Sequence, residues 1–232
     1  MPYYYGFDFT YLILIVPTIL LALWAQMRVQ SAFNTYSKVY ASRGYTAAEV
    51  ARRILDANGL QNIGLERVAG KLTDHYDPKA GVIRLSESVY GSSSVAAIGV
   101  AAHEAGHAVQ DGENYAPMRI RSAIVPITNI GSTLSFPVIL LGVLFAWEPL
   151  VLFGIGLFSL VAVFQLVTLP VEFNASGRAL AVLEGEHLLD GEELKGAQKV
   201  LSAAALTYVA ALISTLAQLL RLFLLFGRRR ND

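Results

Sequence analysis

The stretch AIVPITNIGSTLSFPVILLGVLFAWEPLVLFGIGLFSLVAVFQLVTLP, residues 123–170, decides the fold. It contains one charged residue, Glu148, which is followed directly by Pro149. A helix needs about 20 apolar residues to cross the roughly 30 Å hydrocarbon core of a bilayer. The stretch is therefore long enough for a hairpin of two spans, about 124–146 and 150–170, joined by a tight turn that exposes Glu148.

Two further apolar blocks lie near the ends of the chain. Residues 9–27 carry no charge. Because no basic residue precedes them and no small-x-small cleavage site ends them, we interpret them as an uncleaved anchor rather than a signal peptide. Residues 200–226 carry one charge, Arg221, and we expect them to be either spanning or re-entrant. The sequence thus predicts a mainly α membrane protein with about four hydrophobic helices.

The composition supports this class of protein. Of the 232 residues, 54% are hydrophobic and 16% are charged, and 18 Lys plus Arg balance 18 Asp plus Glu. Since soluble domains average about 25% charged residues, the chain is too poor in charge for a disordered protein, a coiled coil or a nucleic-acid binder. There is no cysteine, which excludes disulfides and thiolate metal sites. Any metal must be held by the four histidines and by carboxylates.

Most of the charge lies in residues 28–122 and 171–199, which we expect to form one compact polar domain at the membrane. Eleven of the Lys and Arg residues fall between Arg28 and Arg121. By the positive-inside rule, the polar domain is cytoplasmic. Residues 228–230 are three arginines. They would lie outside the cell, against this rule, if residues 200–226 span the membrane fully, and inside if those residues are re-entrant.

Residues 28–122 carry the signals of a small α+β domain. Thr46 and Glu49 form a capping box that begins a helix, and Asn58-Gly59 ends it. After this helix the sequence predicts a turn at residues 74–78 and a strand at residues 82–85. A long helix follows at residues 95–110, with its N-cap at Ser92, Ser93 or Ser94.

The long helix contains His103-Glu104-Ala105-Gly106-His107, an H-E-x-x-H pattern. Positions four apart lie on one helix face, so both imidazoles can reach one metal ion, while Glu104 can address a water. Zinc suits such a nitrogen and oxygen site best, although cobalt or manganese fits the same ligands. With an open coordination position this is a hydrolytic site, in which Glu104 is the general acid/base. An ordinary helix with two partly buried histidines is the alternative.

A third ligand must come from elsewhere in the chain. The extended pattern with a third histidine is absent, because the position that it requires holds Glu113. A downstream carboxylate is the other solution, and Glu172 is the leading candidate because it lies where a predicted span meets the polar phase. Glu172 is alternatively a helix-start acid that the helix dipole favours after Pro170.

At these residues the chain resembles the YugP-like bacterial membrane zinc metallopeptidases and, more distantly, the HtpX-like membrane peptidases. The resemblance extends over most of the chain, including residues 74–78, the H-E-x-x-H helix, the hairpin and residues 172–179. It implies a zincin-like catalytic domain in which His103, His107 and Glu172 bind one Zn²⁺ and Glu104 is catalytic. In the HtpX-like relatives an aspartate supports a ligand histidine. In this chain Ser176 takes its place, which can form a hydrogen bond but supplies no charge.

Several other residues have both a functional and a structural interpretation. His75 is either an auxiliary group at the metal or part of a turn, and His187 lies at a solvated helix end where a function is not favoured. Arg178 supports the site, binds a substrate carboxylate or forms a plain ion pair. Tyr208 is either an oxyanion donor or an aromatic packing residue. The segment at residues 82–85 is either a sheet edge that pairs with an extended substrate or an inner strand.

The sequence therefore predicts a multi-pass cell-membrane protein that is a zinc-dependent endopeptidase, acting on a peptide or protein substrate that is itself membrane-associated. A catalytically inactive, zinc-holding scaffold or adaptor is the alternative. A transporter is disfavoured, because the spans contain almost no ionisable residues apart from Arg221.

Overall fold

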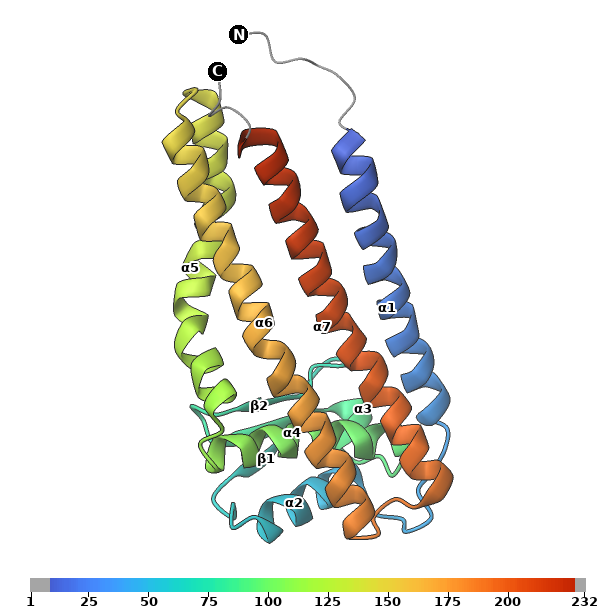
Figure 1. Cartoon of the computed structure of the whole chain (residues 1–232). Coiled ribbons are helices and arrows are strands. Elements are labelled where there is room, and N and C mark those ends of the chain that lie inside the picture. The colour runs from blue at the N-terminus through green and yellow to red at the C-terminus, as the bar shows by residue number, and fades with distance from the viewer. Residues whose placement is uncertain (1–8, 228–232) are drawn as a thin grey trace. The chain divides into compact units, whose positions relative to one another are not determined.

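The computed structural model describes residues 9–227. The arginine cluster at residues 228–230, whose side of the membrane was considered above, lies outside the described residues. Along the chain the elements are η1 (Tyr11–Ile15), α1 (Val16–Tyr36), α2 (Ala47–Ala57), β1 (Gly64–Val68), β2 (His75–Asp77), β3 (Val82–Ser86), α3 (Glu87–Tyr90), α4 (Val95–Gly112), α5 (Ala116–Leu144), α6 (Glu148–Gly185) and α7 (Gly191–Phe226). The fold is the predicted mainly α architecture with one small sheet (Figure 1).

Four helices of the described chain are long and apolar enough to cross a membrane: the helix over Tyr11–Tyr36, α5, α6 and α7. Among the described residues, 9–25, 121–167 and 207–227 form one compact unit that contains most of the apolar parts of these helices. Its buried cluster consists of Ile139, Val151, Ile155 and Leu222. Large apolar side chains elsewhere in the unit are exposed, as expected for residues that face lipid.

The predicted hairpin is formed by α5 and α6. Two glycines let these helices approach closely, because a Cβ on Gly142 would lie 2.7 Å from the backbone N of Val151, and one on Gly154 would lie 2.9 Å from the N of Ile139. The turn between the helices exposes Glu148, which is the first residue of α6.

The second unit contains residues 26–120 and 168–206. The predicted capping box is present at the start of α2, with both reciprocal hydrogen bonds between Thr46 and Glu49. Gly59 follows this helix in the left-handed conformation, with φ of +72°. Of the three serines considered, Ser94 is the N-cap of α4, since its hydroxyl accepts a hydrogen bond from the Ala97 N–H.

The sheet has the strand order β1-β3-β2, with β1 parallel and β2 antiparallel to β3. The prediction of a turn over residues 74–78 was wrong for its central part, because His75–Asp77 pair with β3. The turn begins at Asp77, whose carboxylate accepts hydrogen bonds from the N–H groups of Lys79 and Ala80. Since β3 is paired on both sides, it is the inner strand, and the sheet-edge interpretation of residues 82–85 was wrong.

The core of the second unit surrounds α4, which contacts α2, α3, β2 and β3. Ala97, Ala101 and Ala105 on this helix are fully buried. These small side chains let neighbouring elements approach α4 on several sides, and the lower part of α6 crosses it in Figure 1. The H-E-x-x-H pattern therefore lies on a rigid, closely packed helix. The predicted domain boundaries at residues 27/28, 122/123, 170/171 and 199/200 stay predictions.

Candidate metal site

Helix α4 presents both histidines of the pattern on the same face. The ring centroids of His103 and His107 lie 4.7 Å apart in an edge-to-face arrangement. His107 is buried, with an exposed fraction of 7%, and His103 is partly buried. The spacing of four residues has thus produced the pair of neighbouring imidazoles that the sequence predicted.

Helix α6 brings Glu172 to this pair. Its Oε2 lies 3.3 Å from the Nε2 of His103 and 3.5 Å from the Nε2 of His107, and the residue is 3% exposed. The three residues form a group whose ligand atoms all lie within 4.8 Å of one another. The helix-start interpretation of Glu172 does not apply, since α6 begins at Glu148 and continues through Pro170.

The separations of these atoms fit a metal ion. Zinc lies about 2.0–2.2 Å from imidazole nitrogen and carboxylate oxygen, so two ligands of a tetrahedral ion are about 3.4 Å apart. The two nitrogen–oxygen distances, 3.3 and 3.5 Å, are close to this value. Without a cation, a buried carboxylate beside two imidazoles is costly unless an imidazole is protonated. The donor set is therefore suited to a metal of the zinc type.

The other ring nitrogen of each histidine has a hydrogen-bond partner. The Nδ1 of His107 lies 3.0 Å from the Oε1 of Gln110, and the Nδ1 of His103 lies 3.1 Å from the Oγ of Ser176. Gln110 donates from Nε2 to the carbonyl of Val171, 2.8 Å, so its amide oxygen must face His107. The Nδ1 of His107 is then the protonated nitrogen, and Nε2 is left to bind a metal.

Gln110 also connects the two helices that carry the candidate ligands. Its Nε2 makes a second hydrogen bond, 2.9 Å long, to the Oδ1 of Asn174 on α6, and the residue is completely buried. The sequence reasoning missed this role. The available signal was the spacing of three residues after His107, which places Gln110 on the same side of α4.

The close approach of α4 and α6 depends on Gly106, inside the H-E-x-x-H pattern. A Cβ at this position would lie 2.8 Å from the carbonyl oxygen of Ala175, so a side chain there would push the helices apart. At the end of α4, Glu113 pairs with Arg178 of α6 at 2.7 Å. Arg178 also donates to Asn174, 2.8 Å. The ion-pair interpretation of Arg178 describes these contacts.

The Glu104 carboxylate forms a hydrogen bond with the sheet. Its Oε2 accepts a hydrogen bond of 3.0 Å from the N–H of Tyr76 in β2. The Tyr76 hydroxyl donates to Asp111 on α4, 2.9 Å. Burial raises the pKa of Tyr76, and so does the hydrogen bond to Asp111. The sequence reasoning treated residues 74–78 as a turn and therefore missed this connection between β2 and Glu104.

The electrostatics of the site favour a positive charge. Burial alone would lower the pKa of His107, but hydrogen bonding to Glu172 and the nearby Glu104 raise it above its usual value. A buried position that stabilises a proton between imidazole and carboxylate also stabilises a metal cation.

The remaining candidates do not belong to the group of three candidate ligands. His75 is exposed, and its Nδ1 lies 2.8 Å from the carbonyl of Thr73. His187 is exposed and pairs with Asp190 at 3.2 Å. Tyr208 belongs to the other compact unit, and its role as an oxyanion donor stays a prediction.

Comparisons with known proteins agree with this chemistry. The family model described as "Putative neutral zinc metallopeptidase" matches residues 11–227. The "Putative membrane protease YugP" of Bacillus subtilis (strain 168) is 48% identical over 222 residues, which cover 96% of this chain and 99% of that protein. No solved structure matches the chain significantly.

Proposed function

The chain belongs to the family described as putative neutral zinc metallopeptidases, and we propose that it is a membrane-bound zinc endopeptidase. In this proposal His103, His107 and Glu172 bind a single Zn²⁺, and Glu104 is the general base. The observation that carries the proposal is the convergence of the three ligand atoms within 4.8 Å. Glu104 follows His103 directly on α4, as hydrolysis by this arrangement requires.

The chain's own residues supply a base, a proton shuttle and fixed ligands. Zinc, when bound, would polarise the scissile carbonyl and lower the pKa of water towards about 7. Glu104 accepts a proton from the attacking water and passes it to the leaving amine. Gln110 and Ser176 hold the two imidazoles with Nε2 towards the metal. Three protein ligands leave one position for water or substrate.

The substrate in this proposal is an extended peptide that lies beside β2. This strand is at one edge of the sheet, and the Tyr76 N–H on its outer side already donates to Glu104. A peptide that adds to this edge would lie next to the general base and would be recognised mainly through its backbone. An endopeptidase that binds its substrate in this way would have limited side-chain specificity.

We also propose that the site faces the cytoplasm and cleaves a membrane-associated protein. The eleven Lys and Arg residues between Arg28 and Arg121 support the orientation through the positive-inside rule. The four apolar helices support a substrate at the bilayer, because they hold the enzyme there. Fusing a reporter enzyme to the turn at residues 145–147 tests the orientation, since this turn should be outside the cell.

Purified, zinc-loaded protein tests the proposed reaction. Glu104→Gln should retain wild-type zinc and lose hydrolysis of an unstructured protein substrate, because it keeps the ligands and removes the base. Glu87→Gln, which changes an exposed acid on α3, is the matched control and should cleave normally. Cleavage by Glu104→Gln at the wild-type rate would contradict the mechanism. Full zinc with no hydrolysis by the wild type and no binding of a hydroxamate inhibitor would favour the inactive scaffold.

A further inference from the structure

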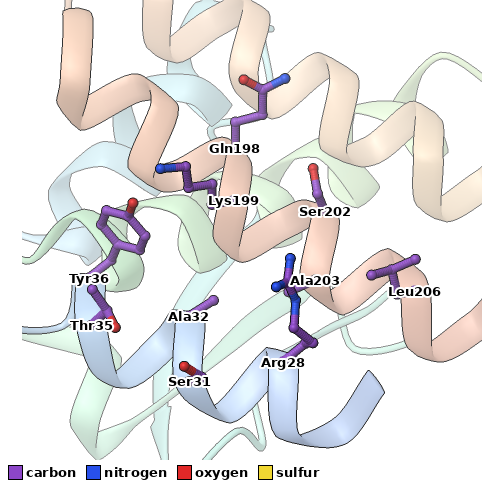
Figure 2. A pocket seen from close by; sticks show the side chains of 10 residues that line it. All are labelled: Arg28, Ser31, Ala32, Thr35, Tyr36, Gln198, Lys199, Ser202, Ala203 and Leu206. Atoms are coloured by element: carbon purple, nitrogen blue, oxygen red, sulfur yellow. The ribbon is translucent and has the colours of Figure 1, made fainter. Parts of the chain in front are cut away.

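A basic pocket separate from the metal ligands lies between α1 and α7. Its volume is about 380 Å³, and all of its lining residues belong to the second compact unit. The α1 side provides one cation and three polar side chains, and the α7 side provides another cation. These lining residues are Arg28, Ser31, Ala32, Thr35, Tyr36, Gln198, Lys199, Ser202, Ala203 and Leu206 (Figure 2).

The lining is suited to an anion with several oxygen atoms. Arg28 reaches from α1 towards α7, and Lys199 extends from α7 on the same side as Tyr36 (Figure 2). The Lys199 Nζ lies 5.8 Å from the centroid of the Tyr36 ring. Ser31 and Ser202 add hydroxyl donors, and none of the ten lining residues is acidic. Two cations with hydroxyls and no carboxylate form a typical phosphate-recognition set.

The position of the pocket along both helices indicates the source of the phosphate. Arg28 is the first charged residue after the apolar segment of α1, which ends at Met27. On α7, Lys199 is the last charged residue before the apolar segment, in which Arg221 is the next charge. Both cations thus come from the point where a helix leaves the hydrocarbon region, which is the level of the lipid headgroups.

We propose that this pocket binds the phosphate headgroup of an anionic membrane lipid. Arg28 and Lys199 pair with the phosphate, and the hydroxyls of Ser31 and Ser202 donate to its remaining oxygens. The lipid thereby fixes α1 against α7 at the edge of the polar unit. The proposal is independent of the peptidase reaction, since it uses none of the residues of the metal site.

Lipid binding to the purified full-length chain in a neutral detergent tests the proposal. Native mass spectrometry should show tighter binding of phosphatidylglycerol than of phosphatidylcholine with the same acyl chains. Arg28→Gln and Lys199→Gln should each weaken phosphatidylglycerol binding about fivefold, since a basic residue near an anionic headgroup contributes about that factor. Lys199→Arg should retain wild-type binding. Ser202→Leu, which narrows the pocket and keeps both cations, should also weaken binding.

Lys195→Gln is the matched control. Lys195 lies one turn before Lys199 on α7, is exposed, and pairs with Glu192 rather than lining the pocket. The proposal is overturned if Lys195→Gln weakens binding as much as Lys199→Gln, or if both lipids bind equally. Displacement of phosphatidylglycerol by inorganic phosphate at equal concentration would overturn the lipid assignment, since the pocket would then recognise phosphate without acyl chains.

Discussion

Replacement of Gln110 by leucine should weaken both the fold and the metal site. The side chain is completely buried and makes three hydrogen bonds, to His107, Val171 and Asn174. Leucine has a similar volume but removes all three, and it leaves the buried Nδ1 of His107 without this partner. At about 1 kcal/mol for each of the three net hydrogen bonds and about 1–3 kcal/mol for an unpaired buried donor, we expect a loss of about 4–6 kcal/mol in unfolding free energy.

The effect on zinc binding should be smaller. Loss of the hydrogen bond that orients a ligand histidine lowers metal affinity about 10- to 100-fold, which is about 1.4–2.8 kcal/mol. Gln110→Glu separates the two roles. Its carboxylate can still accept from His107, so zinc affinity should stay near that of the wild type. It can no longer donate to Val171 and Asn174, so stability should fall.

Competition with a chromogenic chelator measures the zinc affinity, and denaturant unfolding in detergent measures stability. Gln61→Leu is the matched control, because Gln61 is exposed and makes a single hydrogen bond of 3.2 Å to the Asp56 carbonyl. A folded Gln110→Leu protein whose zinc affinity equals that of the control would refute the assignment of Gln110 as a positioning residue.

Three further predictions follow from the packing and the charges. Gly106→Ala should cost about 1–3 kcal/mol in stability and weaken zinc binding, because the added Cβ would meet the Ala175 carbonyl. Gly177→Ala is the control and should change neither stability nor zinc affinity, since its Cβ would meet nothing within 4 Å. Burial raises the pKa of Asp74 despite its hydrogen bonds from Ser86, so the folded state holds the proton more tightly. Stability should therefore fall as pH rises from about 3.9, the pKa of an aspartate in the unfolded chain, through the raised pKa of Asp74 in the folded state. Asp74→Asn should abolish this pH dependence in unfolding titrations. Zinc at 100 times its dissociation constant should stabilise the fold by about 2.7 kcal/mol, and chelation should reverse this in thermal melts.

The local elements were predictable because their signals are local. The capping box at Thr46 and Glu49 and the strand at β3 depend on residues within one short segment. The same holds for the two imidazoles, which the four-residue spacing of a helix brings together. The apolar blocks needed only length and composition, and each lies in a helix long enough to span a bilayer.

The parts that local signals could not predict depend on contacts between distant residues. The segment from His75 to Asp77 becomes a strand because β3 provides its partner, and a run rich in aspartate next to proline gives no sign of this pairing. Glu172 is 69 residues from His103, so its choice as a ligand depended on chemistry and on the family resemblance rather than on spacing. The bonds of Gln110 to α6 are long-range in the same way.

In the proposed site, His103, His107 and Glu172 hold one zinc ion with an open position. X-ray absorption spectroscopy at the zinc edge, with elemental analysis of the same purified sample, tests it most directly. We expect one zinc per chain, with two imidazole ligands and oxygen ligands at about 2.0–2.2 Å, and loss of zinc in Glu172→Ala. A wild-type protein without bound zinc, or a Glu172→Ala variant with an unchanged zinc spectrum, would contradict it.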